Sequence, residues 1–157
     1  MRGQRTLKAR DTIFGAMGRA YVTINGNREE LMYVKNIEAF IEKNKIEVPV
    51  LGQTGTKHKA GGWNGTGSMT IYYCTSLFRK MMLEYVKTGV DTYFEMVLEN
   101  DDPSSSIGKQ TILLKGCNID SVVISKLDVE SEAMDEEVEF TFEDVDMLEE
   151  FRPLVGE

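Results

Sequence analysis

The sequence contains few of the side chains from which disulfide frameworks, metal centres and catalytic relays are built. Its 157 residues include two cysteines and one histidine. Cys74 and Cys117 lie far apart and form no Cys-x-x-Cys pair, a pattern that indicates free, packed thiols rather than a disulfide scaffold or a zinc site. His58 stands between two lysines, which is typical of a solvated loop side chain and not of a metal ligand or general base. We therefore expect no metal site.

Long hydrophobic runs are also missing. No apolar stretch is long enough to cross a bilayer, and the basic residues 1–5 are not followed by the apolar segment of a secretory signal. A hydrophobic content of 41% is sufficient for the core of one compact unit. We expect a soluble protein with a single domain over residues 1–157, made in a cytoplasm and without a membrane partner.

The sequence lacks the motifs that bind nucleotides or divalent cations. Gly62 and Gly67 have the spacing of a phosphate loop, but Ser68 stands where the lysine is required and a strand pattern follows. Thr70 replaces the third glycine of the dinucleotide fingerprint. The acids of residues 128–150 lack the spacing of a calcium loop. Two carboxylates from distant segments could still form a hydrolytic pair, but no residue in the sequence points to such a pair. We expect no catalytic residues and no cofactor, and hence not an enzyme.

The net charge of −8 conceals an uneven distribution. Residues 1–60 carry eleven basic and six acidic side chains, a balance of +5, whereas the remainder carries seven and twenty, a balance of −13. Either copies of the chain stack with basic regions facing acidic ones, or the two regions are separately solvated. A small basic and aromatic cluster, Lys57, His58, Lys59 and Trp63, resembles a nucleic-acid patch. The overall negative charge opposes phosphate binding, so we expect no sequence-specific nucleic acid partner.

One helix has a strong signature. Residues 76–88 place an apolar arc opposite a charged face, and Gly89 provides the left-handed stop. Leu83 interrupts the charged face and is a candidate interface residue, although a single exposed leucine is common. Before this helix, the glycines of residues 61–67 predict a loop and residues 68–73 predict a half-buried strand.

The rest of the chain is mostly strand-like. Alternating patterns predict strands in five places. Asn25-Gly26 predicts a tight turn in the first hairpin. Residues 35–51 fit either a helix or a strand, and Pro49 limits any helix on its far side. We favour a long extended segment over residues 35–51. The predicted strands are residues 20–24 with 31–34, 92–98, 109–119, 121–127 and 137–143, of which 109–127 could be one bent ribbon.

These elements predict a mainly β chain. We expect an antiparallel β-sandwich or a partly closed barrel with one flanking helix at about 76–88. The weakly patterned segments predict a flexible N-terminal arm at about 1–18, a long loop at about 52–66 and an acidic C-terminal tail at about 145–157. A small barrel of this kind could instead carry an apolar ligand, which we keep as the alternative function.

The order of several runs resembles a known family. The runs are Leu51-Gly52, Gly62 to Tyr72 (GWNGTGSMTIY), Thr88-Gly89 after the helix, Gly108 to Ser121 (GKQTILLKGCNIDS) and Asp135 to Asp144 (DEEVEFTFED). Together they resemble the tail tube proteins of myophage-like particles, and most of all the tube subunits of PBSX-type defective prophages. The resemblance spans about residues 18–146.

The resemblance implies a structural protein of a phage or phage-like contractile tail. Such subunits assemble into stacked hexameric rings that form the inner tail tube. The implied partners are further copies of the chain, the tail sheath protein, the tape-measure protein, and the initiator or baseplate and terminator proteins of the tube. The implied location is the bacterial host cytoplasm during assembly and then the tail of the particle.

Three sets of residues become candidate sites under this reading. The loop carrying Lys57, His58, Lys59 and Trp63 could reach an adjacent subunit, and Leu83 could lie in a contact on the helix. The third set is the acidic side of the last strand. We hypothesise that Glu137, Glu139 and Glu143 face the lumen, where negative walls let DNA or an elongated protein slide.

Overall fold

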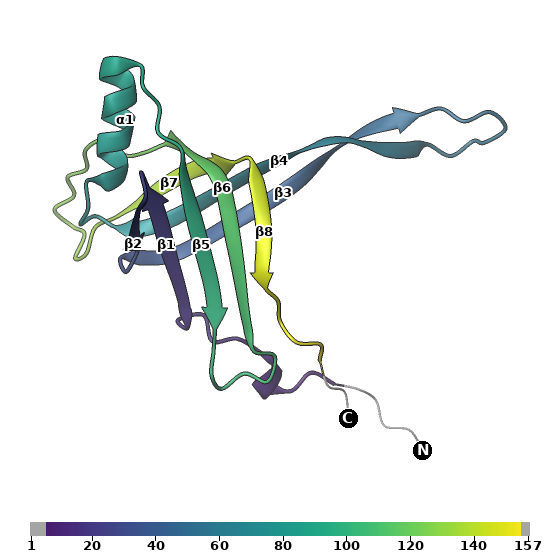
Figure 1. The fold of residues 1–157 in the computed structure, drawn as a ribbon, viewed down its shortest axis with the longest axis horizontal. Coiled ribbons are helices and arrows are strands. Elements are labelled where there is room, and N and C mark those ends of the chain that lie inside the picture. Colours follow the sequence, from purple (N-terminus) through teal and green to yellow (C-terminus); the bar gives the residue numbers. More distant parts are fainter. Residues whose placement is uncertain (1–5, 155–157) are drawn as a thin grey trace. The chain divides into compact units, whose positions relative to one another are not determined.

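The computed structural model describes residues 6–154. They form two compact units, each assembled from separate segments of the chain. Unit 1 contains residues 6–32, 94–115 and 145–154, and unit 2 contains residues 33–93 and 116–144. Figure 1 shows the helix and strands by their labels. The predicted mainly β class with one helix is confirmed, whereas the organisation of residues 1–157 as one domain stays a prediction.

Unit 1 begins with a hairpin whose turn was predicted correctly. Strands β1 (Gly18–Ile24) and β2 (Asn27–Glu30) are joined by Asn25 and Gly26, with φ angles of 51° and 82°. The predicted second strand at 31–34 is wrong, because a two-residue turn sends the chain directly into its partner strand, and Asn27 pairs with Ile24. The polar residues of β2 lie exposed, and the buried Leu31 follows the strand.

Three more strands complete the sheet of unit 1. Strand β5 (Phe94–Asp101) pairs antiparallel with β1, and the strand order is β2, β1, β5, β6 (Lys109–Ser121) and β8 (Asp144–Glu149). Residues 145–149, expected to lie in the acidic tail, therefore belong to strand β8. Two lysines on β6 form ion pairs with acids on β8. Lys115 Nζ lies 2.6 Å from Asp146 Oδ2, and Lys109 Nζ lies 3.3 Å from Glu149 Oε1. Residues 155–157 of the predicted tail lie outside the described residues.

The described part of the predicted N-terminal arm is bonded to the turn after β5. A short 3-10 helix spans Ala9–Asp11. Phe14 N donates to Asp102 Oδ2 at 2.9 Å, and Ser106 Oγ donates to Asp11 Oδ1 at 2.6 Å. The latter bond, followed by the backbone N–H of Lys8, lowers the pKa of Asp11. Residues 1–5 of the arm lie outside the described residues.

Unit 2 is built on a long antiparallel hairpin. Its strands are β3 (Val34–Val48) and β4 (Lys57–Tyr72), followed by β7 (Asp135–Phe142) and the second half of β6, in the order β3, β4, β7, β6. The extended reading of residues 35–51 is confirmed from 35 to 48. The predicted loop at 52–66 is wrong over residues 57–66, which belong to β4. In both units the run of strands ends without returning to its first strand, so neither sheet of the described residues closes into a barrel.

Strand β4 contains glycines at the positions where aromatic rings of β7 lie across its backbone. Gly65 and Gly67 pair with Phe142 and Phe140 of β7, and both phenylalanine rings are buried. The rings fill the space that side chains at these two positions would need. A glycine-rich run therefore forms a strand here, whereas its composition alone predicts a loop.

Helix α1 (Leu77–Thr88) confirms the predicted helix, and Gly89 ends it with a φ of 76°. Thr75 Oγ1 accepts a bond from Leu77 N at 3.3 Å, while Ser76 makes no side-chain cap. Only Phe78 and Met81 of the expected apolar arc are buried. The second half of the arc, including Tyr85 and Val86, is exposed. Fewer apolar side chains of the helix are therefore buried in unit 2 than its periodicity predicts.

Three further expectations concern the cysteines, metal binding and membrane spans. Cys117 is buried and Cys74 is exposed, so the expectation of a packed thiol holds only for Cys117. Among residues 6–154, no group of three or more histidine, cysteine, aspartate or glutamate side chains is placed to hold a metal ion. In the same span, no helix has the length and hydropathy needed to cross a membrane.

Candidate assembly interface

The outer part of the β3–β4 hairpin forms a two-stranded ribbon. β4 pairs with β7 only from Gly65 onward, whereas its pairing with β3 continues to Val48 and Lys57. In the described structure, residues 42–48 and 57–64 thus pair only with each other, and Figure 1 shows them projecting from the rest of unit 2. An isolated two-stranded ribbon is marginal in water and presents unpaired edges. The ribbon is therefore suited to packing against another chain.

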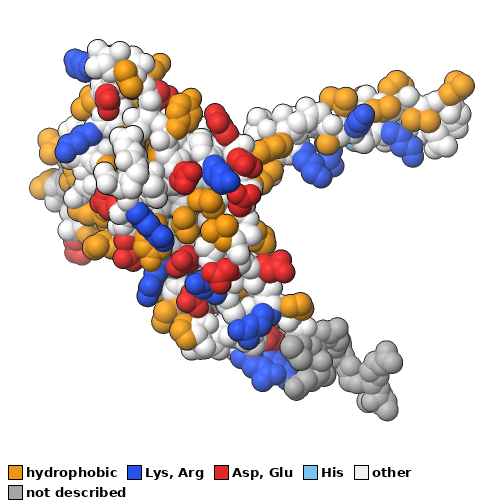
Figure 2. Space-filling view, viewed as in Figure 1, with side chains coloured by type: hydrophobic (Ala, Val, Ile, Leu, Met, Phe, Trp, Pro, Cys, Tyr) orange, Lys and Arg blue, Asp and Glu red, His pale blue; other side chains and the backbone are white. Residues whose placement is uncertain are grey.

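The ribbon carries both apolar and basic side chains, shown in orange and blue in Figure 2. Leu51 at the tip is fully exposed, and Ile41 and Ile46 are more than half exposed. The basic side chains are Lys43, Lys45, Lys57 and Lys59. The ribbon also carries Glu42 and Glu47, so its four lysines leave an excess of positive charge. An exposed surface that combines apolar side chains with an excess of positive charge favours a partner that is apolar and acidic.

The structure separates the four residues of the predicted self-assembly loop. Lys57, His58 and Lys59 lie at the outer end of β4, in strand and not in a loop. Trp63 lies nearer the sheet, where its ring centroid is 6.2 Å from that of Phe142, and 42% of the residue is exposed. Trp63 therefore extends the core of unit 2 toward the ribbon, while the basic residues belong to its tip.

A second surface is the solvent face of the sheet in unit 2. Alternation places Glu137 and Glu139 on this face, opposite the buried Val138 and Phe140, and Glu143 follows in the same sense after Phe142. The strand register adds side chains from β3, β4 and β6 to the same face. We call this set the polar face: Glu38, Phe40, Glu42, Thr66, Ser68, Thr70, Asn118, Asp120, Glu137, Glu139, Thr141 and Glu143.

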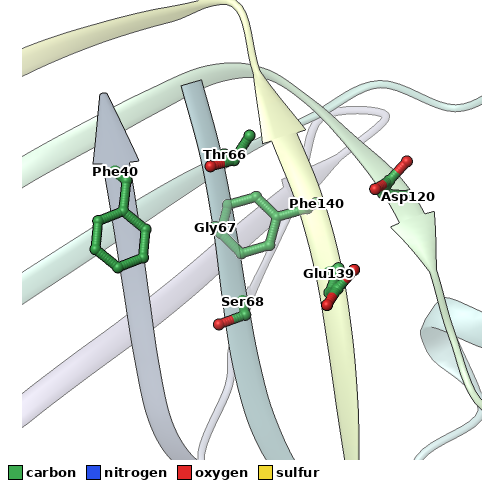
Figure 3. Close-up of a pocket in the computed structure, with 7 residues that line it drawn as sticks. All are labelled: Phe40, Thr66, Gly67, Ser68, Asp120, Glu139 and Phe140. Carbon is green, nitrogen blue, oxygen red and sulfur yellow. The ribbon is translucent and has the colours of Figure 1, made fainter. Parts of the chain in front are cut away.

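The polar face is open, hydroxyl-rich and negative. Figure 3 shows part of it, with Phe40, Ser68, Glu139 and Asp120 coming from four adjacent strands. A groove of about 270 Å³ runs between them, and a second of about 520 Å³ is lined by Glu42, Thr141 and Glu143 among others. The face has six acids and no basic residue. Such a surface repels polyanions at short range.

Sequence reasoning found only half of these acids. Glu38 and Glu42 were missed because residues 35–51 fit a helix as well as a strand, although the pairing of β3 with β4 is continuous from Asn36 to Lys43. The available signal was the alternation of Ile37, Ala39 and Ile41, which in a strand puts Glu38 and Glu42 on the opposite face. Asp120 was missed because the pairing of β6 with β7 shifts between Ile119 and Ser121. A shift of one residue exchanges the two faces of a strand, so alternation in the sequence could not assign Asp120.

A third surface surrounds Leu83 on helix α1. Leu83 is 42% exposed, and it is accompanied by Tyr85 and Val86 on the same helix. Val90 and Tyr93, in the segment after the helix, are exposed as well. Leu83 is therefore one of several uncovered apolar side chains in this part of unit 2, and not the single exception that the helical wheel indicated.

Comparison with known proteins identifies similar chains. A family model described as "Phage tail tube protein" matches residues 5–149. The Phage-like element PBSX protein XkdM of Bacillus subtilis (strain 168) is 47% identical over 143 residues, which cover 91% of this chain and 95% of XkdM. The YqbM protein of the same strain is 46% identical over 146 residues, covering 93% of this chain and 97% of YqbM.

Solved structures share the fold at low sequence identity. The tail tube of SPP1 superposes with a TM-score of 0.62 at 10% identity, covering 87% of this chain and 78% of that one. A chain in the PVC sheath/tube terminator of an extracellular contractile injection system gives a TM-score of 0.62 at 10% identity, covering 83% and 94%. The fold is thus retained where nearly all residues have changed.

Proposed function

The chain belongs to the phage tail tube protein family, and on that premise we propose that its copies form hexameric rings that stack into the inner tube of a contractile tail. Membership makes it a structural tail tube subunit and not an enzyme, as predicted. The observation that carries the stacking proposal is the β3–β4 ribbon, which has no other strand to pair with in the described part of the chain. A tube reuses each contact many times, so modest interfaces suffice.

The ribbon supplies the contact between rings under this proposal. Its outer strands are long enough to leave their own subunit, and their exposed apolar side chains gain stability only when a neighbour covers them. Trp63 and Ile41 at the ribbon base form a further contact with the adjacent subunit. Leu83 and the apolar side chains near it form another surface for tail partners.

The polar face lines the lumen in this arrangement. Its six acids and its hydroxyl groups give a wall that repels polyanions and holds no apolar cargo. Glu137, Glu139 and Glu143 keep their predicted role, and Glu38, Glu42 and Asp120 join them. Tape-measure protein or DNA would pass such a wall without binding to it.

The partners and location follow from the same proposal. Solved relatives of this fold occur in a sheath–tube complex, a baseplate and a tube-terminating cap of injection systems. By analogy this chain contacts further copies of itself, the tail sheath, the tape-measure protein, an initiator or baseplate protein and a terminator. It assembles in the bacterial host cytoplasm and ends in the tail of the particle.

The alternative, a barrel that carries an apolar ligand, has no observation in its favour. Neither sheet closes within residues 6–154, and the grooves described above are open and lined largely by polar side chains. A carrier needs an enclosed apolar cavity.

Electron microscopy of the purified chain tests the proposal. Concentrated protein, with or without tail fragments as seeds, is expected to form six-fold rings and hollow tubes. A matched variant, Glu137→Lys with Glu139→Lys, should still assemble while its lumen binds DNA. Protein that stays monomeric at every concentration, even with seeds, would contradict the proposal.

A further inference from the structure

Residues 127–134 form a short arch between β6 and β7, and its base is held by several bonds. Lys126 Nζ donates to Asp135 O at 2.8 Å, and Tyr73 N donates to Met134 O at 2.9 Å. Inside the arch, Glu130 N donates to Asp128 Oδ1 at 3.1 Å. We refer to residues 127–134 as the arch. Its bonds give the segment a defined shape although it contains no strand or helix.

The segment that leads into the arch is fixed to helix α1 and β7. The guanidinium of Arg79 donates to Glu136 and to Val123 O, and it lies 4.4 Å from the ring centroid of Tyr73. Lys126 N donates to the hydroxyl of Tyr73 at 3.3 Å. The residues that flank the arch are therefore held in place by hydrogen bonds. A segment that is already ordered loses less conformational entropy when a partner binds it.

The arch exposes apolar side chains among acids. Leu127 is 94% exposed and Val129 is 100% exposed, although both could have been polar at no cost to the unit. Three acids lie beside these two side chains in the sequence, namely Asp128, Glu130 and Glu132. Residues 127–134 contain no basic side chain. A partner for this surface must offer apolar side chains surrounded by positive charge.

The ribbon tip of the same chain has that composition. Leu51 and Val50 are exposed at the turn, and just behind it lie three lysines and one acid, Lys45, Lys57, Lys59 and Glu47, so the tip is apolar with an excess of positive charge. We propose that the ribbon tip of one copy docks on the arch of the next copy, with Leu51 against Leu127 and Val129 and the lysines facing the acids. The proposal rests on the proposed tube and names the surface that receives the ribbon.

The positions of the two surfaces suit a contact that repeats. Lys57 begins β4, and Tyr72 at its other end pairs with Asp135 at the base of the arch. At about 3.3 Å per residue, these ends of β4 lie up to about 50 Å apart. Figure 1 shows the tip and the segment before β7 at opposite ends of unit 2. A donor and an acceptor at opposite ends give a head-to-tail contact that extends along an axis.

Disulfide crosslinking tests this pairing directly. In a Cys74→Ser background, Leu51→Cys and Val129→Cys are made as separate proteins, and Cys117 stays buried. The two are mixed under assembly conditions and oxidised, and dimers are counted on a non-reducing gel. The mixture should crosslink at least about tenfold more than either protein alone, because a head-to-tail contact brings unlike positions together. Leu51→Cys mixed with Met32→Cys, an exposed residue of unit 1, is the control.

Charge reversal provides a second readout. Lys57→Glu with Lys59→Glu should reduce the number of tubes by about tenfold or more, and adding Glu130→Lys with Glu132→Lys should restore them. Reversal of Glu29 and Glu30 on β2 should not restore them. If tubes form but the 51–129 mixture does not crosslink, the arch is not the receiving surface and the proposed function stands. If neither tubes nor crosslinks form with seeds present, both proposals fail.

Discussion

The ring of Phe140 lies directly over Gly67. A Cβ atom built on Gly67 would lie 2.4 Å from Cζ of Phe140 and 2.9 Å from the carbonyl oxygen of Glu38. Phe140 is 1% exposed. This contact explains how a glycine-rich run serves as the central strand of unit 2, and it places β4 close enough to β7 for the polar face to form.

Gly67→Ala is therefore expected to destabilise the protein. The added methyl group must displace the Phe140 ring or the backbone of β3, which costs about 1–3 kcal/mol in a packed core. Gly55→Ala is the matched control, because a Cβ at Gly55 meets nothing within 4 Å. Chemical denaturation measures both variants. Equal unfolding midpoints for the two alanine variants would show that the Phe140 ring does not restrict position 67.

Arg79→Met is expected to cost about 3–5 kcal/mol, because it leaves the carboxylate of Glu136 buried without its partner. The two side chains are 12% and 1% exposed. Lys35→Met removes an ion pair whose side chains are both 37% exposed, and it should cost far less. Thermal or denaturant unfolding compares the two. A loss for Arg79→Met no larger than that for Lys35→Met would contradict the structural role assigned to Arg79.

The pair of Lys35 and Asp135 makes stability depend on pH at the acidic end. The hydrogen bond from Lys35, followed by its charge, lowers the pKa of Asp135, and the same bond raises the pKa of Lys35. A carboxyl whose folded pKa is depressed stabilises the fold above its unfolded pKa and loses this contribution as pH falls through the folded pKa. Lys35→Gln should move the Asp135 pKa upward in an NMR titration. An unchanged titration would mean that Lys35 does not pair with Asp135 in solution.

Shortening the ribbon should abolish assembly while leaving the fold intact. Replacing residues 45–60 with Asn-Gly removes strand segments that pair only with each other, so the expected loss of stability is below about 1 kcal/mol. The variant should keep its circular dichroism spectrum and melting transition but form no tubes under the microscope. Tubes of normal length from this variant would show that the ribbon does not join the rings.

The regular elements were predictable where local patterns were strong. The helix at 77–88 follows from its apolar periodicity and Gly89, the first turn from Asn25-Gly26, and β7 from the alternation of residues 137–142. The extended state of residues 35–48 was favoured but not decided by the sequence, because Ile37, Phe40 and Ile41 fit both periods.

The misplaced elements depend on contacts distant in sequence. Residues 57–66 are strand because β3 pairs with them and because Phe140 and Phe142 cover the glycines. Residues 144–149 are strand because they pair with β6, whose Lys109 and Lys115 form ion pairs with Glu149 and Asp146. The position of Asp120 on the polar face depends on a register shift in β6 that no local pattern encodes. These contacts form only in the folded chain, so local composition predicted a loop and a tail where the structure has strands.

The central claim is that the chain acts as a self-assembling tube subunit whose ribbon crosses between rings and whose polar face lines the channel. A cryo-EM reconstruction of tubes formed by the chain tests it most directly. The account predicts stacked six-fold rings, the β3–β4 ribbon reaching a subunit of the next ring, and Glu38, Glu137 and Glu139 facing the channel. A reconstruction with the polar face turned outward and the ribbon folded within its own subunit would contradict it.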